Sequence, residues 1–165
     1  MKTVPLDPTW YPHAYSRQIQ LYETDAFGHT NNVSFFAFLE SARFDLLKQL
    51  EFFDPQDILT LHLILAHLEC NYRKIVRFND RLTIYTRVVE IGSSSFTLEH
   101  ILVRERDREI VADGNAVLVA FDHKKDRPRR LSLTEKEKLE RYRSDRGKNG
   151  EPAAPSTHGP VLSEG

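Results

Sequence analysis

The chain has 165 residues, of which 40% are hydrophobic and 28% charged, a composition typical of one folded domain and not of a disordered or membrane chain. A formal net charge of −1 excludes a global basic field, so we expect no nucleic-acid partner. A single cysteine, Cys70, excludes an intrachain disulfide, and no apolar leader or membrane-spanning stretch is found, so we expect a cytoplasmic protein with no membrane association.

The first elements are an arm, a strand and a turn. Residues 1–14 contain three prolines, which excludes a regular helix and indicates an extended arm that packs by its aromatic side chains. Over residues 15–22, Ile19 and Leu21 alternate with glutamines, the period of a half-buried strand. A polar turn, residues 23–32, follows.

The next segment, residues 33–50, is expected to be a long helix. Its apolar residues recur at helical spacing over about five turns. Asn31 or Asn32 is a suitable N-cap. The first half is apolar almost all round, which predicts a helix enclosed on several sides.

The remainder of the domain is strand-like. Four proline-free segments are rich in β-branched, aromatic or leucine residues and are joined by turn signals. They are residues 61–72, 81–91, 96–104 and 110–121. One strand, one long helix and four strands in this order predict an α+β domain in which an antiparallel sheet wraps a buried helix.

The end of the chain changes in character. Residues 132–143 are rich in Lys and Glu, with Thr134 and Glu137 at capping-box spacing, which predicts a short exposed helix. Residues 144–165 hold too few large apolar side chains to offset the entropy of ordering them, so we expect a disordered tail after a domain of residues 1–143.

Two motifs resemble those of a known family. The turn Glu-Thr-Asp-Ala-Phe-Gly-His-Thr-Asn-Asn at 23–32 resembles the Asp-x-x-Gly-His-Val-Asn-Asn signature of hot-dog thioesterases in the 4-hydroxybenzoyl-CoA thioesterase family. The run Phe-Ala-Phe-Leu-Glu-Ser-Ala-Arg at 36–43 and the block at 70–82 are also similar to that family. The block departs from the family at Ile75, usually proline, and Asn79, usually glycine. The resemblance covers about residues 15–131.

The resemblance implies a fold, an assembly and a substrate. The fold is the hot-dog fold, a five-stranded antiparallel sheet wrapped round one long central helix. Two subunits join their sheets edge to edge, in a homodimer or a homotetramer, with the active sites at the interface. The substrate is an acyl-CoA thioester, and no cofactor is needed.

Thioester hydrolysis requires a carboxylate to act as base or nucleophile and donors to hold the oxyanion. Asp25 can supply the carboxylate, and we expect Ala26 and Phe27 to exclude water and raise its basicity. The first backbone N–H groups of the helix can supply the donors. By the resemblance, the N–H of Asn32 is the donor, and Gly28 lets the chain turn tightly against a ligand.

Asp25, His29 and Glu40 each have an alternative interpretation. Asp25 could be no more than a turn or capping carboxylate, because Asp is common before helices. His29 is expected to play a supporting or structural part. Glu40, which an ion pair with Arg43 would explain, is the second-choice carboxylate.

The sequence offers candidate residues for binding coenzyme A and the acyl chain. Coenzyme A needs cations for its phosphates and an apolar slot for pantetheine. The candidate cations are Arg73, Lys74, Arg77 and the run at 124–130, and the resemblance adds Ser94 and Ser95. The candidate acyl-pocket residues are Phe27 and Phe36, with Phe35 and Phe38, although core packing is the stronger expectation for most of them.

Several rival activities can be weighed from the sequence. The other histidines show no metal-ligand spacing, so no metal is expected. The absence of a Gly-x-Ser-x-Gly elbow argues against an α/β-hydrolase, and no His-x-x-x-Gly-His-Pro stretch supports a dehydratase. The surviving alternative is a protein that binds or senses acyl-CoA or acyl carrier protein without hydrolysis.

Overall fold

The structure is a computed structural model and describes residues 7–144. Its helices are α1 (Asn32–Gln49) and α2 (Leu133–Glu140), with 3₁₀ turns at Pro8–Trp10, Leu21–Glu23 and Ile58–Thr60. Its strands are β1 (His13–Gln18), β2 (Leu63–Leu68), β3 (Asn71–Tyr72), β4 (Arg81–Ile91), β5 (Ser95–Arg104), β6 (Glu109–Asp122) and β7 (Arg127–Pro128). Almost all of the predicted tail, residues 145–165, lies outside the described residues.

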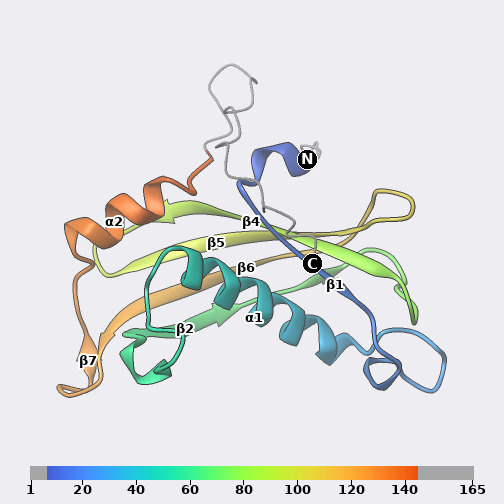
Figure 1. The fold of residues 1–165 in the computed structure, drawn as a ribbon, viewed down its shortest axis with the longest axis horizontal. Coiled ribbons are helices and arrows are strands. Elements are labelled where there is room, and N and C mark those ends of the chain that lie inside the picture. Colours follow the sequence, from blue (N-terminus) through green and yellow to red (C-terminus); the bar gives the residue numbers. More distant parts are fainter. Residues whose placement is uncertain (1–6, 145–165) are drawn as a thin grey trace, which may run out of the picture.

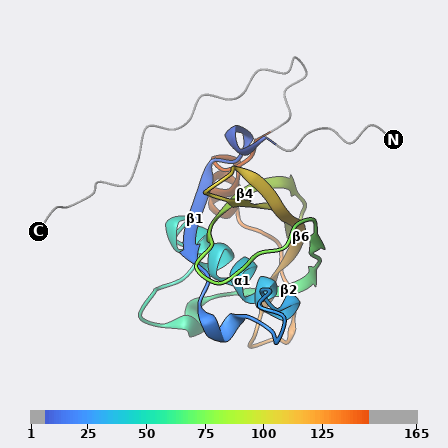
Figure 2. The same cartoon turned by 90° about the vertical axis from the view of Figure 1, so that its right-hand side faces the viewer.

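The strands form one antiparallel sheet in the order β1-β4-β5-β6-β2. Helix α1 lies along one face of this sheet (Figure 1), and the end-on view in Figure 2 shows the sheet curling round it. The predicted hot-dog architecture of five strands round one helix is confirmed. Two short strands, β3 and β7, pair with β6 in addition.

Helix α1 begins where the sequence predicts. The Asn31 side chain is the N-cap and accepts a hydrogen bond from the Val33 N–H at 3.0 Å. The prediction that the helix is enclosed on several sides is wrong within one chain. Phe38 and Leu39 are fully buried against the sheet, but Val33 on the opposite face is 67% exposed. The described chain therefore leaves an apolar stripe of α1, which includes Val33 and Phe36, uncovered.

The core beneath α1 has two apolar halves, one around Leu46 and Phe96 and one around Phe38 and Ile84. Between them runs a row of residues paired across four neighbouring strands. Its members are His13, Thr86, His100 and Gly114. His13, Thr86 and His100 are each at most 2% exposed, so this row places buried polar groups across the middle of the sheet.

Two of the predicted strands, at residues 15–22 and 61–72, differ clearly from those observed. The first strand ends at Gln18, and the following residues form a 3₁₀ turn, because the Glu23 carboxylate accepts the Gln20 N–H at 2.8 Å and closes a capping box. The predicted strand at 61–72 is interrupted at residues 69–70. At this point the Glu69 carbonyl crosses so close to Gly114 that a Cβ on the glycine would lie 2.0 Å from it.

The ends of the domain also need correction. The capping box of α2 is formed by Ser132 and Glu135, not by Thr134 and Glu137. Ser144, assigned above to the tail, is buried, and its carbonyl accepts a hydrogen bond from Arg87 at 3.2 Å. Within its described residues the arm packs by an aromatic side chain as predicted, because Tyr11 lies in a small outer cluster with Ile101 and Val103. The arm is not extended throughout, since Pro8–Trp10 form a 3₁₀ turn and β1 already begins at His13.

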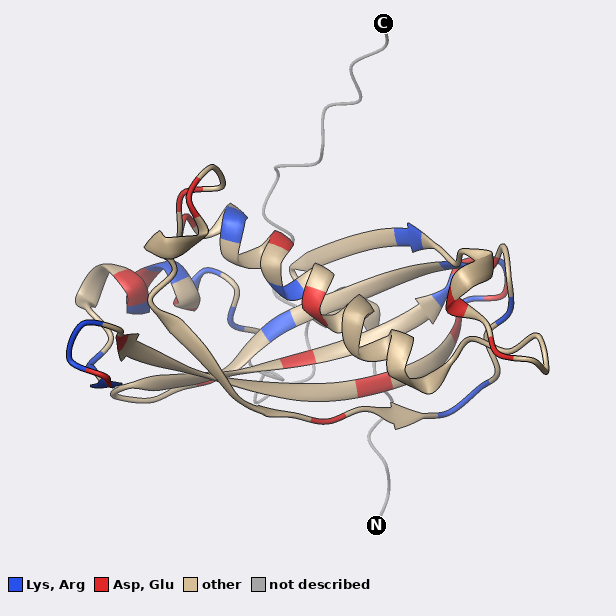
Figure 3. Ribbon diagram, turned by 90° about the horizontal axis from the view of Figure 1, so that it is seen from below, with Lys and Arg blue, Asp and Glu red and all other residues tan. Residues whose placement is uncertain are grey.

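Figure 3 shows residues of both charge signs mixed at the two ends of the sheet. Neither α1 nor α2, the two α-helices of residues 7–144, has the continuous apolar length that spanning a bilayer requires.

Candidate active site

The turn that carries Asp25 is held by its own side chain. The Asp25 Oδ1 atom accepts hydrogen bonds from the Phe27 N–H at 2.9 Å and the His29 N–H at 3.1 Å. The Gly28 N–H closes the turn on the Asp25 carbonyl at 3.1 Å, and Gly28 has φ of 72°, a conformation that favours glycine. Within residues 7–144 the Oδ2 atom has no hydrogen-bond partner, so this oxygen is available to a ligand.

Two tertiary contacts fix the base of this turn. The buried Glu23 carboxylate pairs with Arg17 of β1, and the Glu23 carbonyl accepts the Asn31 N–H at 2.7 Å. On the other side, the Thr30 N–H donates to the Val76 carbonyl at 2.7 Å. The buried ion pair was not predicted from the sequence, because nothing in the spacing of its two residues shows that they are buried together.

The amino end of α1 offers a free backbone donor. Asn31 satisfies the Val33 N–H, but the Asn32 N–H has no acceptor in the described part of the chain. The dipole of the 18-residue helix favours negative charge at this end. The Asn32 amide can therefore stabilise an oxyanion that is brought to it.

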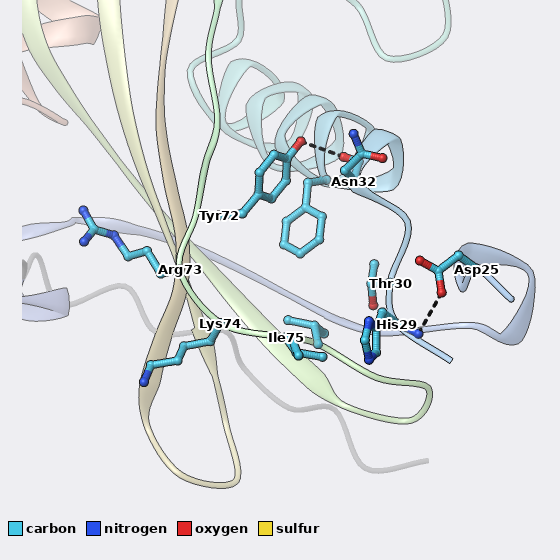
Figure 4. Close-up of a pocket in the computed structure, with 10 residues that line it drawn as sticks. Asp25, His29, Thr30, Asn32, Tyr72, Arg73, Lys74 and Ile75 are labelled. Atoms are coloured by element: carbon cyan, nitrogen blue, oxygen red, sulfur yellow. Dashed lines mark hydrogen bonds between the residues drawn. The ribbon is translucent and has the colours of Figure 1, made fainter. Parts of the chain in front are cut away.

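Asp25 and Asn32 line the same pocket, which has a volume of about 370 Å³. Figure 4 shows the Asp25 carboxylate pointing towards Thr30 and His29, with Asn32 and Tyr72 further along the pocket wall. The complete lining is Asp25, His29, Thr30, Asn32, Phe35, Tyr72, Arg73, Lys74, Ile75 and Val76. The structure thus brings together six of the predicted site residues: Asp25, His29, Asn32, Phe35, Arg73 and Lys74.

The two cations of the pocket each have a carboxylate partner. Arg73 pairs with Asp113 through its Nε atom, and this hydrogen bond raises the already high pKa of the guanidinium. Lys74 Nζ lies 3.7 Å from a Glu109 carboxylate oxygen. Both side chains are about half exposed, and Figure 4 shows their charged ends directed away from Asp25 and Asn32, towards the outside of the pocket.

Other predicted residues lie outside this pocket. Gly28 is adjacent to it in the turn but does not line it. Ser94 and Ser95 lie in the β4–β5 hairpin next to Phe96, which packs in the core half around Leu50 and not in the half that contains Phe35.

The shielding expected of Phe27 is wrong within one chain. The Phe27 side chain is 81% exposed at the tip of the turn, and Asp25 is exposed as well. Phe36 is 37% exposed on the uncovered stripe of α1. The second-choice carboxylate, Glu40, is exposed two turns along the helix and lies 3.9 Å from Arg43, the local ion pair that was expected. Among the phenylalanines, Phe35 lines the pocket while Phe38 is core.

No group of three or more His, Cys, Asp or Glu side chains within 7–144 is arranged to hold a metal ion. The only cysteine, Cys70, is half-buried, and this burial raises the pKa of its thiol to about 11. The thiol therefore stays protonated at neutral pH and is a weak nucleophile.

An antiparallel sheet curled round one long helix is the architecture of the hot-dog class of proteins, and in this chain a turn that carries a carboxylate lies at the amino end of the helix. Residues 19–143 match the family described as the thioesterase-like superfamily, so the chain belongs to this family.

Three relatives place the chain among known proteins. It is 28% identical over 123 residues to the long-chain acyl-CoA thioesterase FadM of Escherichia coli (strain K12), an alignment that covers 74% of this chain and 93% of FadM. The structure of the PA5185 protein from Pseudomonas aeruginosa is similar with a TM-score of 0.72 and 28% identity, over 82% of this chain and 94% of that one. A thioesterase from Thermus thermophilus, solved with coenzyme A and Zn, shares the fold with a TM-score of 0.70 and 24% identity, over 80% and 95% of the two chains.

Proposed function

We propose that this protein hydrolyses acyl-CoA thioesters to a free acid and coenzyme A. The observation that carries the proposal is that the free Oδ2 atom of Asp25 and the free N–H of Asn32 belong to one pocket at the amino end of α1. A carboxylate and an oxyanion donor are the two groups that attack on a thioester carbonyl requires.

The chemistry divides between these two groups. The Asn32 N–H donates to the carbonyl oxygen and stabilises the negative charge that develops on it. The Asp25 carboxylate either takes a proton from the attacking water or attacks the carbonyl carbon itself, and both routes stay open. In either route the carbon–sulfur bond breaks, the thiolate leaves with the electron pair, and water supplies the hydroxyl of the acid. Because Oδ1 is already bound by two backbone N–H groups, the turn fixes the direction of Oδ2.

A second copy of the chain completes the site in this proposal. Strand β2 is an edge of the sheet, and its exposed residues include Ile64 and Leu65. The uncovered stripe of α1 and the exposed Phe27 are further apolar surface near the pocket. We infer a homodimer, or a homotetramer built from it, in which the partner covers these surfaces and supplies its own Ser94 and Ser95 to the pantetheine arm.

The coenzyme A assignment is supported by the cations of the pocket and by the relatives. Arg73 and Lys74 line the pocket. Arg77 lies in the adjacent loop, where its backbone forms an isolated antiparallel β-bridge with His29. One relative is named a long-chain acyl-CoA thioesterase, and one similar structure was solved with coenzyme A. A cytoplasmic location remains a prediction.

A binding protein without hydrolysis is the second candidate. It is favoured by one observation: Asp25 is exposed and already serves as an acceptor within its own turn, which is a sufficient structural reason for the residue. The two candidates differ in whether the thioester bond is broken.

The deciding experiment combines turnover with binding. The full chain is incubated with a panel of short, long and aromatic acyl-CoAs, release of free thiol is followed, and affinity is measured in parallel by calorimetry. Hydrolysis of any panel member well above the buffer rate supports the enzyme. Tight binding of an acyl-CoA without thiol release supports the sensor and refutes the hydrolase.

A further inference from the structure

A tyrosine from outside the predicted turn reaches the amino end of α1. Tyr72 of β3 donates its hydroxyl proton to the backbone carbonyl of Asn32 at 2.9 Å (Figure 4). Its ring also meets Phe35 edge-on, with centroids 5.1 Å apart and planes at 83°. Both partners belong to the first turn of the helix, and all three residues line the pocket. Tyr72 thus touches the residue that carries the proposed oxyanion donor.

We propose that Tyr72 is a positioning residue for the oxyanion-binding amide of Asn32, a role that rests on the proposed function. The carbonyl held by Tyr72 and the amide that would hold the substrate oxygen are attached to the same Cα atom. A fixed carbonyl and a packed Phe35 ring limit fraying of the first helical turn, where helices are least stable. A donor that is already aimed needs no reorganisation when charge develops on the carbonyl oxygen.

The strand that carries Tyr72 is itself anchored. Tyr72 pairs with Ala112 of β6, and the neighbouring Asn71 side chain donates to Asp113 at 3.1 Å. Beyond Tyr72, the Arg73 and Lys74 amides both donate to the Val111 carbonyl, at 2.8 and 3.1 Å. The phenol therefore projects from a backbone that is fixed to the sheet on both sides of it.

The protonation state suits a donor. Tyr72 is 47% exposed, and the partial desolvation of its phenol, together with the neighbouring Cys70 thiol, raises the pKa of that phenol above its ordinary value. The hydroxyl therefore keeps its proton at neutral pH, and the Asn32 carbonyl, which has no proton to give, must be the acceptor.

The simpler explanation is that Tyr72 only fastens the helix to the sheet. Such a fastening would affect the free energy of unfolding but would not change the polarisation of a bound carbonyl. The test therefore needs a readout at the carbonyl of the ligand as well as a rate.

The variant Tyr72→Phe removes the hydroxyl and keeps the ring that packs on Phe35. We expect kcat for acyl-CoA hydrolysis to fall about tenfold with KM nearly unchanged, the loss that one ordinary hydrogen bond supports. The matched control is Tyr22→Phe, because Tyr22 is 84% exposed and its hydroxyl has no partner within residues 7–144; its kcat should equal that of the wild type. Thermal unfolding of each variant reports its stability.

The second readout uses an acyl-CoA analogue in which a methylene replaces the thioester sulfur, so that the carbonyl is kept but cannot be hydrolysed. Infrared difference spectra should show the bound carbonyl stretch at lower wavenumber than in water for the wild type and for Tyr22→Phe, with a smaller shift for Tyr72→Phe. An unchanged shift in Tyr72→Phe overturns the positioning role, whatever the kcat. Because this readout needs no turnover, it tests Tyr72 even if the wild type hydrolyses none of the acyl-CoA panel, an outcome that would refute the proposed function alone.

Discussion

The two histidines of the buried row across the sheet, His13 and His100, predict that the protein loses stability as the pH falls below 6.5. His100 is fully buried between Thr86 and Gly114, and its Nδ1 lies 2.9 Å from the Thr86 hydroxyl. Burial, with the nearby charges of Arg43 and His13, lowers the pKa of His100 from 6.5 to about 3. Its imidazole is therefore neutral in the folded protein at every pH above about 3.

The size and sign of the effect follow from linkage. The unfolded chain protonates His100 near pH 6.5, whereas the folded chain does so only near pH 3, so between these values the unfolded state binds more protons and gains stability as the pH falls. At about pH 5, roughly 1.5 pH units below the pKa of an unfolded histidine, His100 lowers the free energy of unfolding by about 2 kcal/mol. His13, whose pKa is lowered mainly by burial against the opposing effect of Asp45, adds in the same direction. Above pH 6.5 both histidines are neutral in the folded and in the unfolded state, so they no longer lower the free energy of unfolding.

The assay is urea unfolding of the wild type and of His100→Gln at about pH 7 and about pH 5. The wild type should lose at least about 2 kcal/mol between the two conditions, and His100→Gln should lose about 2 kcal/mol less, even if it is less stable at neutral pH. His67→Gln is the matched control, because the His67 side chain is 57% exposed and its removal should leave the slope unchanged. The hydrogen bond from Arg104 lowers the pKa of Asp107 below the ordinary value of an aspartate, so this carboxylate contributes little in this window. A wild-type slope that persists in His100→Gln would refute the reasoning.

Three further substitutions test the scaffold of the site. Gly114→Ala should destabilise by at least about 3 kcal/mol because its Cβ would lie 2.0 Å from the Glu69 carbonyl oxygen; an unchanged urea midpoint would contradict the close crossing. Arg17→Met leaves the buried Glu23 carboxylate unpaired and should cost about 3–5 kcal/mol of unfolding free energy, and a loss below about 1 kcal/mol would show that the pair is solvated. Asn31→Asp keeps the N-cap acceptor but adds a negative charge at the helix end, so it should lower kcat about tenfold at an unchanged melting temperature; wild-type kcat would argue against an oxyanion there.

The long elements could be predicted because their patterns are local and repeat over many residues. Helix α1 and strands β4, β5 and β6 match the predicted segments within one residue at every end. The failures have nonlocal causes. The first strand stops at Gln18 where Glu23 turns back onto it, and the segment before β3 breaks where its backbone crosses Gly114 on a distant strand.

The residues of the candidate site show the same difference between local patterns and nonlocal contacts. Asp25, Gly28 and Asn32 lie in one contiguous motif, so the sequence identified them together. The contact between Tyr72 and Asn32 joins residues 40 positions apart, and it depends on tertiary contacts such as the pairing of β3 with β6, which no local pattern reveals. The exposure of Phe27 could not be foreseen either, because a hydrophobic residue at a turn tip is buried or exposed according to what packs over it.

The most direct test of the proposed chemistry is the kcat of Asp25→Asn on the acyl-CoA that the wild type hydrolyses best. Asparagine keeps the Oδ1 atom that accepts from Phe27 and His29, so the turn should survive, but it removes the negative charge from the free oxygen. We predict a fall in kcat of at least about a hundredfold with an unchanged melting temperature. A kcat within about threefold of the wild type would contradict the assignment of Asp25 as base or nucleophile, because a lost general base costs far more than that.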